Sequence, residues 1–209
     1  KIKNIFMLTG YGAMYLNDSI TSKKIKYYAA RNEAAAPMMA KGLSTVTGKV
    51  SAVCVTAGPG ATNAIPGLAE CWVDSSPIII ISGQVDRKDT TRLSKVKNLR
   101  TVGTAEIDII PIVKPLTKYC AFIKNPNTIK YVMEKAYHLC TSGRPGPVWI
   151  DIPLDVQSSR INLSKLKSFK QKSDLKKKNH DSQISKLIKK IQGSKSPVIV
   201  AGQGVRLSN

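Results

Sequence analysis

The chain has 209 residues, of which 42% are hydrophobic, and its formal net charge at pH 7 is +20. This hydrophobic content is ordinary for a globular protein and excludes a disordered chain. No apolar run approaches the ~20 residues of a membrane-spanning helix, and no secretory signal precedes the first predicted strand. We therefore expect neither a membrane protein nor a secreted one. Because the chain begins at Lys1, almost inside that strand, we expect a piece of a longer protein.

Short apolar runs alternate with helical patterns as far as residue 153. Continuous apolar strands separated by helices are typical of a parallel sheet that helices cover on both faces. The sequence therefore predicts an α/β fold with a doubly wound, mostly parallel six-stranded sheet. The predicted strands are residues 4–10, 24–30, 50–58, 77–83, 114–123 and 146–153, and the predicted helices are residues 13–20, 32–48, 61–75 and 127–141.

Three regions are predicted along the chain. Residues 1–160 form the sheet domain, residues 161–180 a basic linker, and residues 181–209 the incomplete start of a second α/β domain. In the last region, "SQISKLIKKIQGSKSPVIVAGQGV" predicts an amphipathic helix, a strand and a glycine-rich turn. A lone helix and strand cannot bury a core of their own.

The positive charge is concentrated in residues 165–190. A pI near 9.9 makes nucleic acid or an acidic surface a candidate partner. However, Phe169 is the one aromatic residue among these lysines, and no nucleic-acid-binding motif surrounds them. We therefore expect a solvated linker and no nucleic-acid partner.

The chain has four widely spaced cysteines in apolar contexts: Cys54, Cys71, Cys120 and Cys140. They form no CxxC pair, and neither His138 nor His180 lies at metal-ligand spacing from them. This pattern predicts reduced, mostly buried thiols in a cytoplasmic protein.

Candidate functional residues follow the predicted strands, because ligands of open α/β sheets bind beyond the carboxyl ends of the strands. Residues 9–12, residues 31–33 and the turn "TAGPGATN" all fall there. Glu33 lies at the start of a predicted helix, beside the small apolar run "AAAPMMA". Two interpretations remain open from spacing alone. Glu33 stabilises the helix dipole by about 0.3–1 kcal/mol, or it shares a proton with a ring nitrogen.

The turn "GPGATN" suits a flat, uncharged ring better than a diphosphate. Gly58 and Gly60 allow close backbone approach, Pro59 stiffens the bend, and Asn63 offers an amide. No Gly-Lys-Ser/Thr follows, and the turn is not a G-x-G-x-x-G dinucleotide fingerprint. A strand–helix connection that binds nothing is the alternative.

Four motifs together are more specific than any of them alone: "RNEAAA", "GLSTVTGK", "VCVTAGPGATNAIPGLAECWVDSSPIIIISGQV" and "TSGRPGPVWIDIPLDVQ". In order and spacing they resemble the thiamine-diphosphate-dependent enzymes of the acetolactate synthase group, and the resemblance extends from Ile5 to Val205. It implies that the first domain binds the pyrimidine ring of the cofactor and that a central domain, which often binds FAD, follows. A third domain, not contained in this chain, would bind the diphosphate and Mg²⁺.

The resemblance also implies roles for individual residues. Glu33 is equivalent to the catalytic glutamate and would exchange a proton with the pyrimidine N1′. The implied cofactor-binding residues are Gly58, Pro59, Gly60 and Asn63, with Gln84 in a supporting role.

The implied reaction decarboxylates a small 2-oxo acid such as pyruvate and transfers the two-carbon unit to a second carbonyl compound. We expect a homodimer or homotetramer with an active site shared between subunits, and we leave a regulatory subunit open as a further partner. The fragment alone should be inactive. The alternatives are a related non-carboligating thiamine-diphosphate decarboxylase or acyl-CoA lyase, and a degenerate homologue that binds without catalysis.

Four positions depart from the family pattern. Tyr11 stands where glycine is usual beside the reacting centre, and Ala34 stands where glutamine commonly follows the glutamate. Ala105 replaces the glutamine of a "QE" pair that, in relatives, reaches the active site across the subunit interface. Tyr11 and Ala105 are therefore expected near the substrate, and loss of a positioning amide can lower the rate greatly. Lys41 replaces a common acid, and we expect it to be a solvated surface lysine.

Overall fold

The computed structural model describes residues 2–23, 25–171 and 180–208. The chain divides into two compact units, Lys1–Phe169 and Lys170–Asn209. Residues 172–179 of the predicted basic linker lie outside the described residues.

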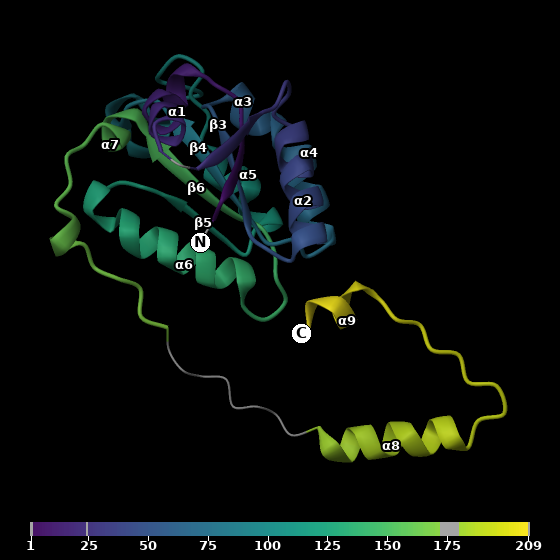
Figure 1. Ribbon diagram of the computed structural model, residues 1–209. Coiled ribbons are helices and arrows are strands. Elements are labelled where there is room, and N and C mark those ends of the chain that lie inside the picture. Colours follow the sequence, from purple (N-terminus) through teal and green to yellow (C-terminus); the bar gives the residue numbers. More distant parts are fainter. Residues whose placement is uncertain (1, 24, 172–179, 209) are drawn as a thin grey trace. The chain divides into compact units, whose positions relative to one another are not determined.

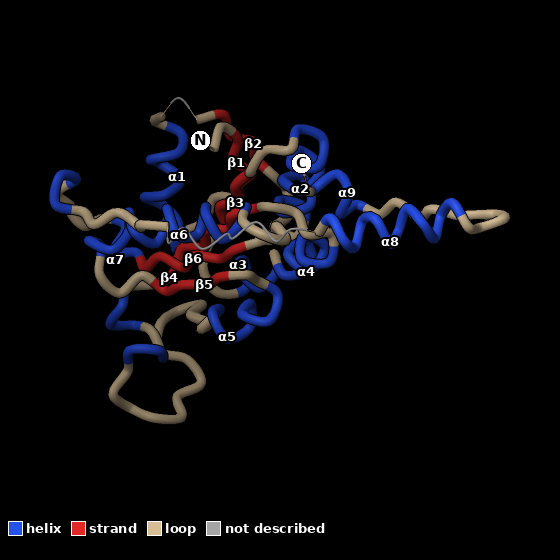
Figure 2. The backbone as a smooth tube through the Cα atoms, turned by 90° about the horizontal axis from the view of Figure 1, so that it is seen from below, coloured by secondary structure: helices blue, strands red, loops and turns tan. Residues whose placement is uncertain are grey.

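The first unit is built on a six-stranded sheet in which every strand pairing is parallel, shown in red in Figure 2. The strand order across the sheet is β2-β1-β3-β4-β6-β5. The strands are β1 (Asn4–Met7), β2 (Lys26–Ala29), β3 (Ser51–Val55), β4 (Ile78–Gln84), β5 (Tyr119–Phe122) and β6 (Val148–Pro153). The predicted doubly wound sheet is confirmed. Its central strands β3, β4 and β6 are the continuous apolar runs that indicated it, because both of their faces are covered.

Helices cover both faces of the sheet (Figure 1). Side chains alternate between the faces along each strand, so Ile80 packs in the core of one face and Ile79 in the core of the other. The first face carries α2 (Ala35–Thr47), α4 (Ile65–Val73) and α5 (Ile109–Val113), and the second carries α1 (Met14–Thr21), α6 (Ile129–Thr141) and α7 (Leu154–Gln157). No helix in the described part of the chain is long and apolar enough to cross a membrane.

The single helix predicted over residues 61–75 is two helices, α3 (Pro59–Asn63) and α4, which meet at Ala64. Pro66 explains the interruption, because a proline has no N–H to donate to the preceding turn and its ring clashes with that turn's carbonyl. The turn therefore leads into a short helix of its own, whose first residue is Pro59.

Lys41 is not the solvated surface lysine that the sequence suggested. Its ammonium group pairs with the carboxylates of Glu70 and Asp74. Hydrogen bonds to Asp74 and then to Glu70 raise the pKa of Lys41. The lysine therefore connects α2 to the C-terminal end of α4.

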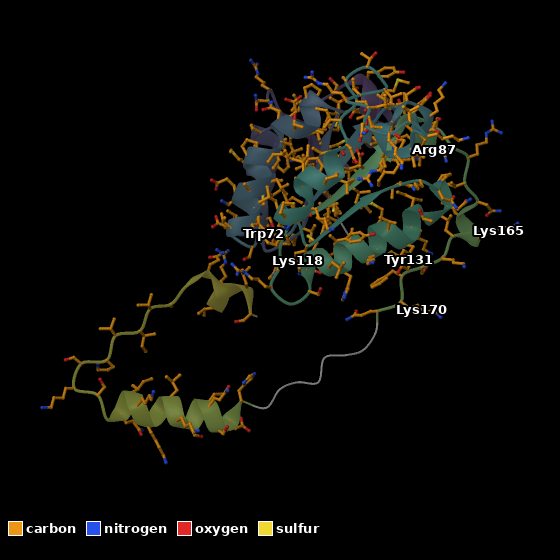
Figure 3. All side chains as sticks on the ribbon, turned by 180° about the vertical axis from the view of Figure 1, so that it is seen from behind. Trp72, Arg87, Lys118, Tyr131, Lys165 and Lys170 are labelled. Atoms are coloured by element: carbon orange, nitrogen blue, oxygen red, sulfur yellow. The ribbon has the colours of Figure 1, made fainter. Side chains whose placement is uncertain are left out.

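The first unit extends beyond residue 160, where the linker was predicted to begin. Phe169 packs edge-on against Tyr131 of α6, with the ring centroids 5.6 Å apart, and it also contacts His138. The backbone N–H of Phe169 donates to the Glu134 carboxylate at 2.7 Å. Figure 3 labels Tyr131 on α6. It also labels Lys165 and Lys170, which flank Phe169 in the sequence. One aromatic ring and one hydrogen bond thus hold the segment after β6 along α6.

In the second unit the predicted helix is present as α8 (Asp181–Gln192), whereas the strand predicted in "PVIVAG" is not formed. Val198, Ile199 and Val200 are exposed there. A strand needs a neighbour to accept and donate its backbone hydrogen bonds, and no described segment pairs with these residues. The chain continues instead into α9 (Gln203–Leu207).

All four cysteines are unpaired, as the sequence predicted, and three of them are buried: Cys54, Cys71 and Cys140. Burial raises the pKa of each of these three thiols to about 12. They stay protonated near neutral pH and therefore act as small apolar side chains rather than as nucleophiles.

Candidate functional site

Glu33 lies in the turn that joins β2 to α2, at the carboxyl edge of the sheet. The Asn32 side chain accepts the N–H of Ala34 at 2.8 Å, which fixes this turn and delays the start of α2 to residue 35. The Oε2 atom of Glu33 accepts a hydrogen bond from Asn63 Nδ2 at 2.7 Å. Its Oε1 atom has no hydrogen-bond partner in the described part of the chain. One oxygen of the Glu33 carboxyl group is therefore hydrogen-bonded to Asn63, and the other can accept or donate a hydrogen bond to a ligand.

The predicted turn packs directly against this carboxyl group. A Cβ atom added to Gly60 would lie 3.2 Å from Glu33 Oε1 and 2.5 Å from Thr56 Cγ2. Pro59 and Asn63 are exposed at the same place. The backbone can thus approach the carboxyl group only because Gly60 lacks a side chain. The structure brings together Glu33, the glycine turn and Asn63, which are distant in sequence.

Thr56 joins the turn to the loop after β1, and the sequence analysis did not single it out. Its hydroxyl oxygen accepts the N–H of Gly12 at 3.1 Å. A Cβ atom on Gly10 would lie 2.5 Å from Thr56 Cβ, and one on Gly60 would lie equally close to Thr56 Cγ2. The Thr56 side chain therefore fills the space beside Gly10 and Gly60. Tyr11, which lies between Gly10 and Gly12, is 71% exposed, and its ring is available to a ligand or a partner. The signal that could have identified Thr56 is the presence of glycines on two separate segments expected at one edge.

Ala105 lies against the turn within its own chain. A Cβ atom on Gly58, whose φ is +56°, would fall 1.8 Å from the Ala105 carbonyl oxygen. Ala105 itself has a φ of +58°. The next residue, Glu106, is buried and accepts hydrogen bonds from Thr91 and from the Val102 N–H. Glu106 thus fixes the loop, and the part of Ala105 that meets the turn is its backbone.

Gln84 is buried at the end of β4, and its amide is fully used within the protein. Its Nε2 donates to the Ile107 carbonyl at 2.9 Å and to Asp151 Oδ2 at 3.2 Å. Its Oε1 accepts the Val85 N–H at 3.0 Å. Gln84 therefore connects β4, β6 and the loop that carries Ala105, and a direct role in cofactor binding stays a prediction.

Asp151 is the acid at the centre of this buried network. Ser82 donates to its Oδ1 at 2.6 Å and itself accepts from the Trp149 indole N–H at 2.8 Å. Burial raises the pKa of Asp151 to about 7, although the hydrogen bonds from Ser82 and Gln84 act in the opposite direction. The sequence carried a signal for it, a single acid within the apolar strand "VWIDIP".

This pKa makes the stability of the protein depend on pH. Between the unfolded pKa of 3.8 and the folded pKa of about 7, the folded state keeps the Asp151 proton that the unfolded state has released. The contribution of Asp151 to stability is therefore fully present below the unfolded pKa and is lost as the pH rises through about 7. We expect the stability advantage of the wild type over Asp151→Asn to shrink by a few kcal/mol across this window, measured by urea unfolding at several pH values.

The exposed acid Asp18 provides the control, because its side chain makes no hydrogen bond in the described part of the chain. Asp18→Asn should show no such pH-dependent difference. A difference between wild type and Asp151→Asn that is the same at low and high pH would contradict the assignment.

The residues at this edge fit a flat nitrogen heterocycle. The glycine turn lies beside the Glu33 carboxyl group, and the Oε1 atom of Glu33, which has no partner in the described part of the chain, can meet a ring nitrogen. Within residues 2–23, 25–171 and 180–208, no cluster of three or more His, Cys, Asp or Glu side chains could hold a metal ion. The fold is that of a doubly wound α/β domain, a class of protein in which ligands bind beyond the carboxyl ends of the strands, where Glu33 and the glycine turn lie.

Comparison with known proteins identifies the family. Residues 1–110 match the family model described as "Thiamine pyrophosphate enzyme, N-terminal TPP binding domain", thiamine pyrophosphate being the same compound as thiamine diphosphate. The chain belongs to this family of thiamine pyrophosphate enzymes.

Curated relatives agree with this assignment. The acetolactate synthase large subunit of Buchnera aphidicola subsp. Schizaphis graminum is 35% identical over 100% of this chain and 36% of that protein. The large subunit from Lactococcus lactis is 36% identical over 99% of the chain and 35% of its own length. The isozyme 3 large subunit of Escherichia coli is 34% identical over 97% and 34%. The chain thus spans about a third of the length of these relatives.

Proposed function

We propose that this chain forms the pyrimidine-binding part of a thiamine-diphosphate-dependent enzyme of the acetolactate synthase type. The observation that carries the proposal is the Glu33 carboxyl group, held by Asn63 through Oε2 and open at Oε1 beside the glycine turn. The similarity to acetolactate synthase large subunits over nearly the whole chain supports the reaction type. The proposed reaction is decarboxylation of pyruvate or a similar 2-oxo acid and transfer of the two-carbon unit to a second carbonyl compound.

Each residue of the site has a defined task in this proposal. Bound thiamine diphosphate supplies the electron sink that makes loss of carbon dioxide from a 2-oxo acid feasible. Glu33 would exchange a proton through Oε1 with the pyrimidine ring of the cofactor, and the hydrogen bond from Asn63 to Oε2 fixes the orientation of the carboxyl group. Gly60 lets the turn lie against the Glu33 carboxyl group, and Gly58 leaves room for the Ala105 carbonyl.

The remaining parts of the proposal rest on the resemblance. The diphosphate and Mg²⁺ would be bound by a domain outside these 209 residues, and FAD would bind in the central domain if this enzyme uses it. The enzyme would work in the cytoplasm as a homodimer or homotetramer with a shared active site, and a regulatory subunit is a further candidate partner. The 209-residue chain alone would then be inactive.

The test uses the full-length protein with thiamine diphosphate, Mg²⁺ and pyruvate, and it measures carbon dioxide and acetolactate together. Equal molar release of both products per two pyruvate molecules is the expected result. Carbon dioxide without acetolactate would identify a decarboxylase that does not ligate, and turnover of an acyl-CoA substrate instead would identify a lyase. Acetolactate formed by the 209-residue chain alone would contradict its proposed dependence on other domains.

A non-catalytic homologue is the second candidate, and one observation favours it. Ala105 offers a methyl group and a carbonyl at a position where the family resemblance implies a positioning amide. The intact set of Glu33, Pro59 and Asn63 opposes it. Saturable binding of thiamine diphosphate with no turnover of any 2-oxo acid is the outcome that would favour this candidate.

A further inference from the structure

A cavity of about 490 Å³ lies at the opposite end of the strands from Glu33. It is lined by Trp72, Val73, Ser75, Lys118, Arg144 and Pro145. These residues come from the C-terminal end of α4 and from the segments just before β5 and β6. They therefore surround the amino ends of the strands, whereas the Glu33 turn lies at the carboxyl ends. This cavity is separate from the cofactor site.

Two cations line the cavity, and neither has an acidic partner in the described part of the chain. The Lys118 ammonium donates to the carbonyl of Ser142, the residue that follows α6. The Arg144 Nε donates to the Ser75 hydroxyl at 2.7 Å. Each contact uses only part of the donor capacity of its cation. The remaining N–H groups are free to bind an anion.

The surroundings of Lys118 strengthen this reading. Burial lowers the pKa of Lys118, since its charge is partly removed from water without a carboxylate nearby. An anion bound in the cavity would pair with the Lys118 ammonium group and offset the free-energy cost of its partial burial. The hydrogen bond from Lys118 to the Ser142 carbonyl places the ammonium group at the C-terminal end of α6. The helix dipole there carries only a partial negative charge, so it balances the charge of Lys118 only in part.

The rest of the wall is apolar. Trp72 is 39% exposed although it is a large aromatic residue, and Val73 beside it is exposed as well. Pro145 completes this side of the cavity. Figure 3 labels Trp72 and Lys118, which lie close together at one end of the sheet. An indole face next to a cation suits a ligand that is flat and apolar at one end and anionic at the other.

We propose that this cavity binds a small organic anion with a flat apolar body. The anionic head lies between Lys118 and Arg144, and the ring packs on Trp72. The cavity volume is within the range of sites that enclose small ligands, about 300–1,000 Å³. A carboxylate and a phosphate ester share the required chemistry, and the experiment separates them.

The experiment measures binding to the full-length protein by isothermal titration calorimetry at low ionic strength with four probes. Phenyl phosphate and benzoate carry both the ring and the charge, benzyl alcohol carries the ring alone, and inorganic phosphate carries the charge alone. We expect saturable binding of one or both aromatic anions, at least tenfold tighter than either partial probe. The tighter of the two identifies the preferred head group. Tryptophan fluorescence should change on binding, because Trp72 lines the cavity while Trp149 is fully buried.

The variants Arg144→Gln and Trp72→Leu should each weaken binding of the aromatic anion about tenfold, as expected for loss of one charged hydrogen bond or one ring contact. Arg160→Gln is the matched control, since Arg160 is exposed and does not line the cavity. It should bind as the wild type does. If Arg144→Gln is poorly folded by circular dichroism, Trp72→Leu decides. Absence of saturable binding of either aromatic anion, binding of benzyl alcohol as tight as that of the tighter aromatic anion, or unchanged affinity in the folded variants overturns the proposal.

Discussion

Replacement of Glu33 by glutamine is expected to lower the proposed turnover of pyruvate by the full-length protein about 10²–10⁴-fold, the usual contribution of a positioned acid or base. Glutamine has nearly the same shape, and its side-chain oxygen can still accept from Asn63 Nδ2. It cannot, however, release or take up a proton near neutral pH. The variant should therefore fold normally and still bind thiamine diphosphate while turning over slowly.

The measurement compares steady-state turnover of pyruvate with the thiamine diphosphate affinity of the same preparations. Glu70→Gln is the matched control, because Glu70 is an exposed acid of α4 that pairs with Lys41 and lies away from the glycine turn. It should keep nearly full activity. A Glu33→Gln variant that turns over pyruvate at the wild-type rate would remove this carboxyl group from the mechanism.

The sequence was sufficient to predict the sheet because its central strands obey a simple rule. A strand covered on both faces is a nearly continuous apolar run, and residues 52–55 and 78–81 have that pattern. The position of Glu33 followed from the same rule, since a residue just after a parallel strand lies at the carboxyl edge. What the sequence could predict was therefore which segments meet at that edge.

The sequence could not predict which atoms touch there. The contact between the Ala105 carbonyl and Gly58 depends on a left-handed backbone at residue 105, in a residue that has no intrinsic preference for it. That conformation is imposed by the hydrogen bonds of Glu106, which come from segments up to 15 residues away in the chain. Thr56 was missed for a related reason. Its importance comes from the space left by Gly10 and Gly60, and this space exists only after the strands have paired.

The strand expected in residues 197–202 shows the opposite limit. Its composition, with Val198, Ile199 and Val200, has high β-propensity. Propensity describes how well a residue fits a sheet that already exists, and no strand in the described part of the chain offers that sheet. Local pattern alone was therefore insufficient, whereas for β3 and β4 the pattern and the neighbours agree.

Substitution of Gly58 by alanine tests the geometry of the turn and is expected to destabilise the first unit by about 2–5 kcal/mol. Two effects add. Alanine at a φ of +56° is strained by roughly 1–2 kcal/mol, and its Cβ would overlap the Ala105 carbonyl oxygen, an overpacking effect of about 1–3 kcal/mol. Because the turn must move to relieve the overlap, we also expect thiamine diphosphate to bind much more weakly to the full-length variant.

Urea unfolding measures the first effect, and a cofactor titration measures the second. Gly42→Ala is the control for both, since Gly42 lies within α2 and a Cβ atom there would meet nothing within 4 Å. This substitution should stabilise the helix by about 0.5–1 kcal/mol and leave cofactor binding unchanged. The two substitutions are thus predicted to change the free energy of unfolding in opposite directions. The difference comes from the backbone conformation at each glycine and from the space around it. A Gly58→Ala protein that is as stable as the wild type would mean that Ala105 does not press on the turn, and the loop that carries it would then be free to leave the site.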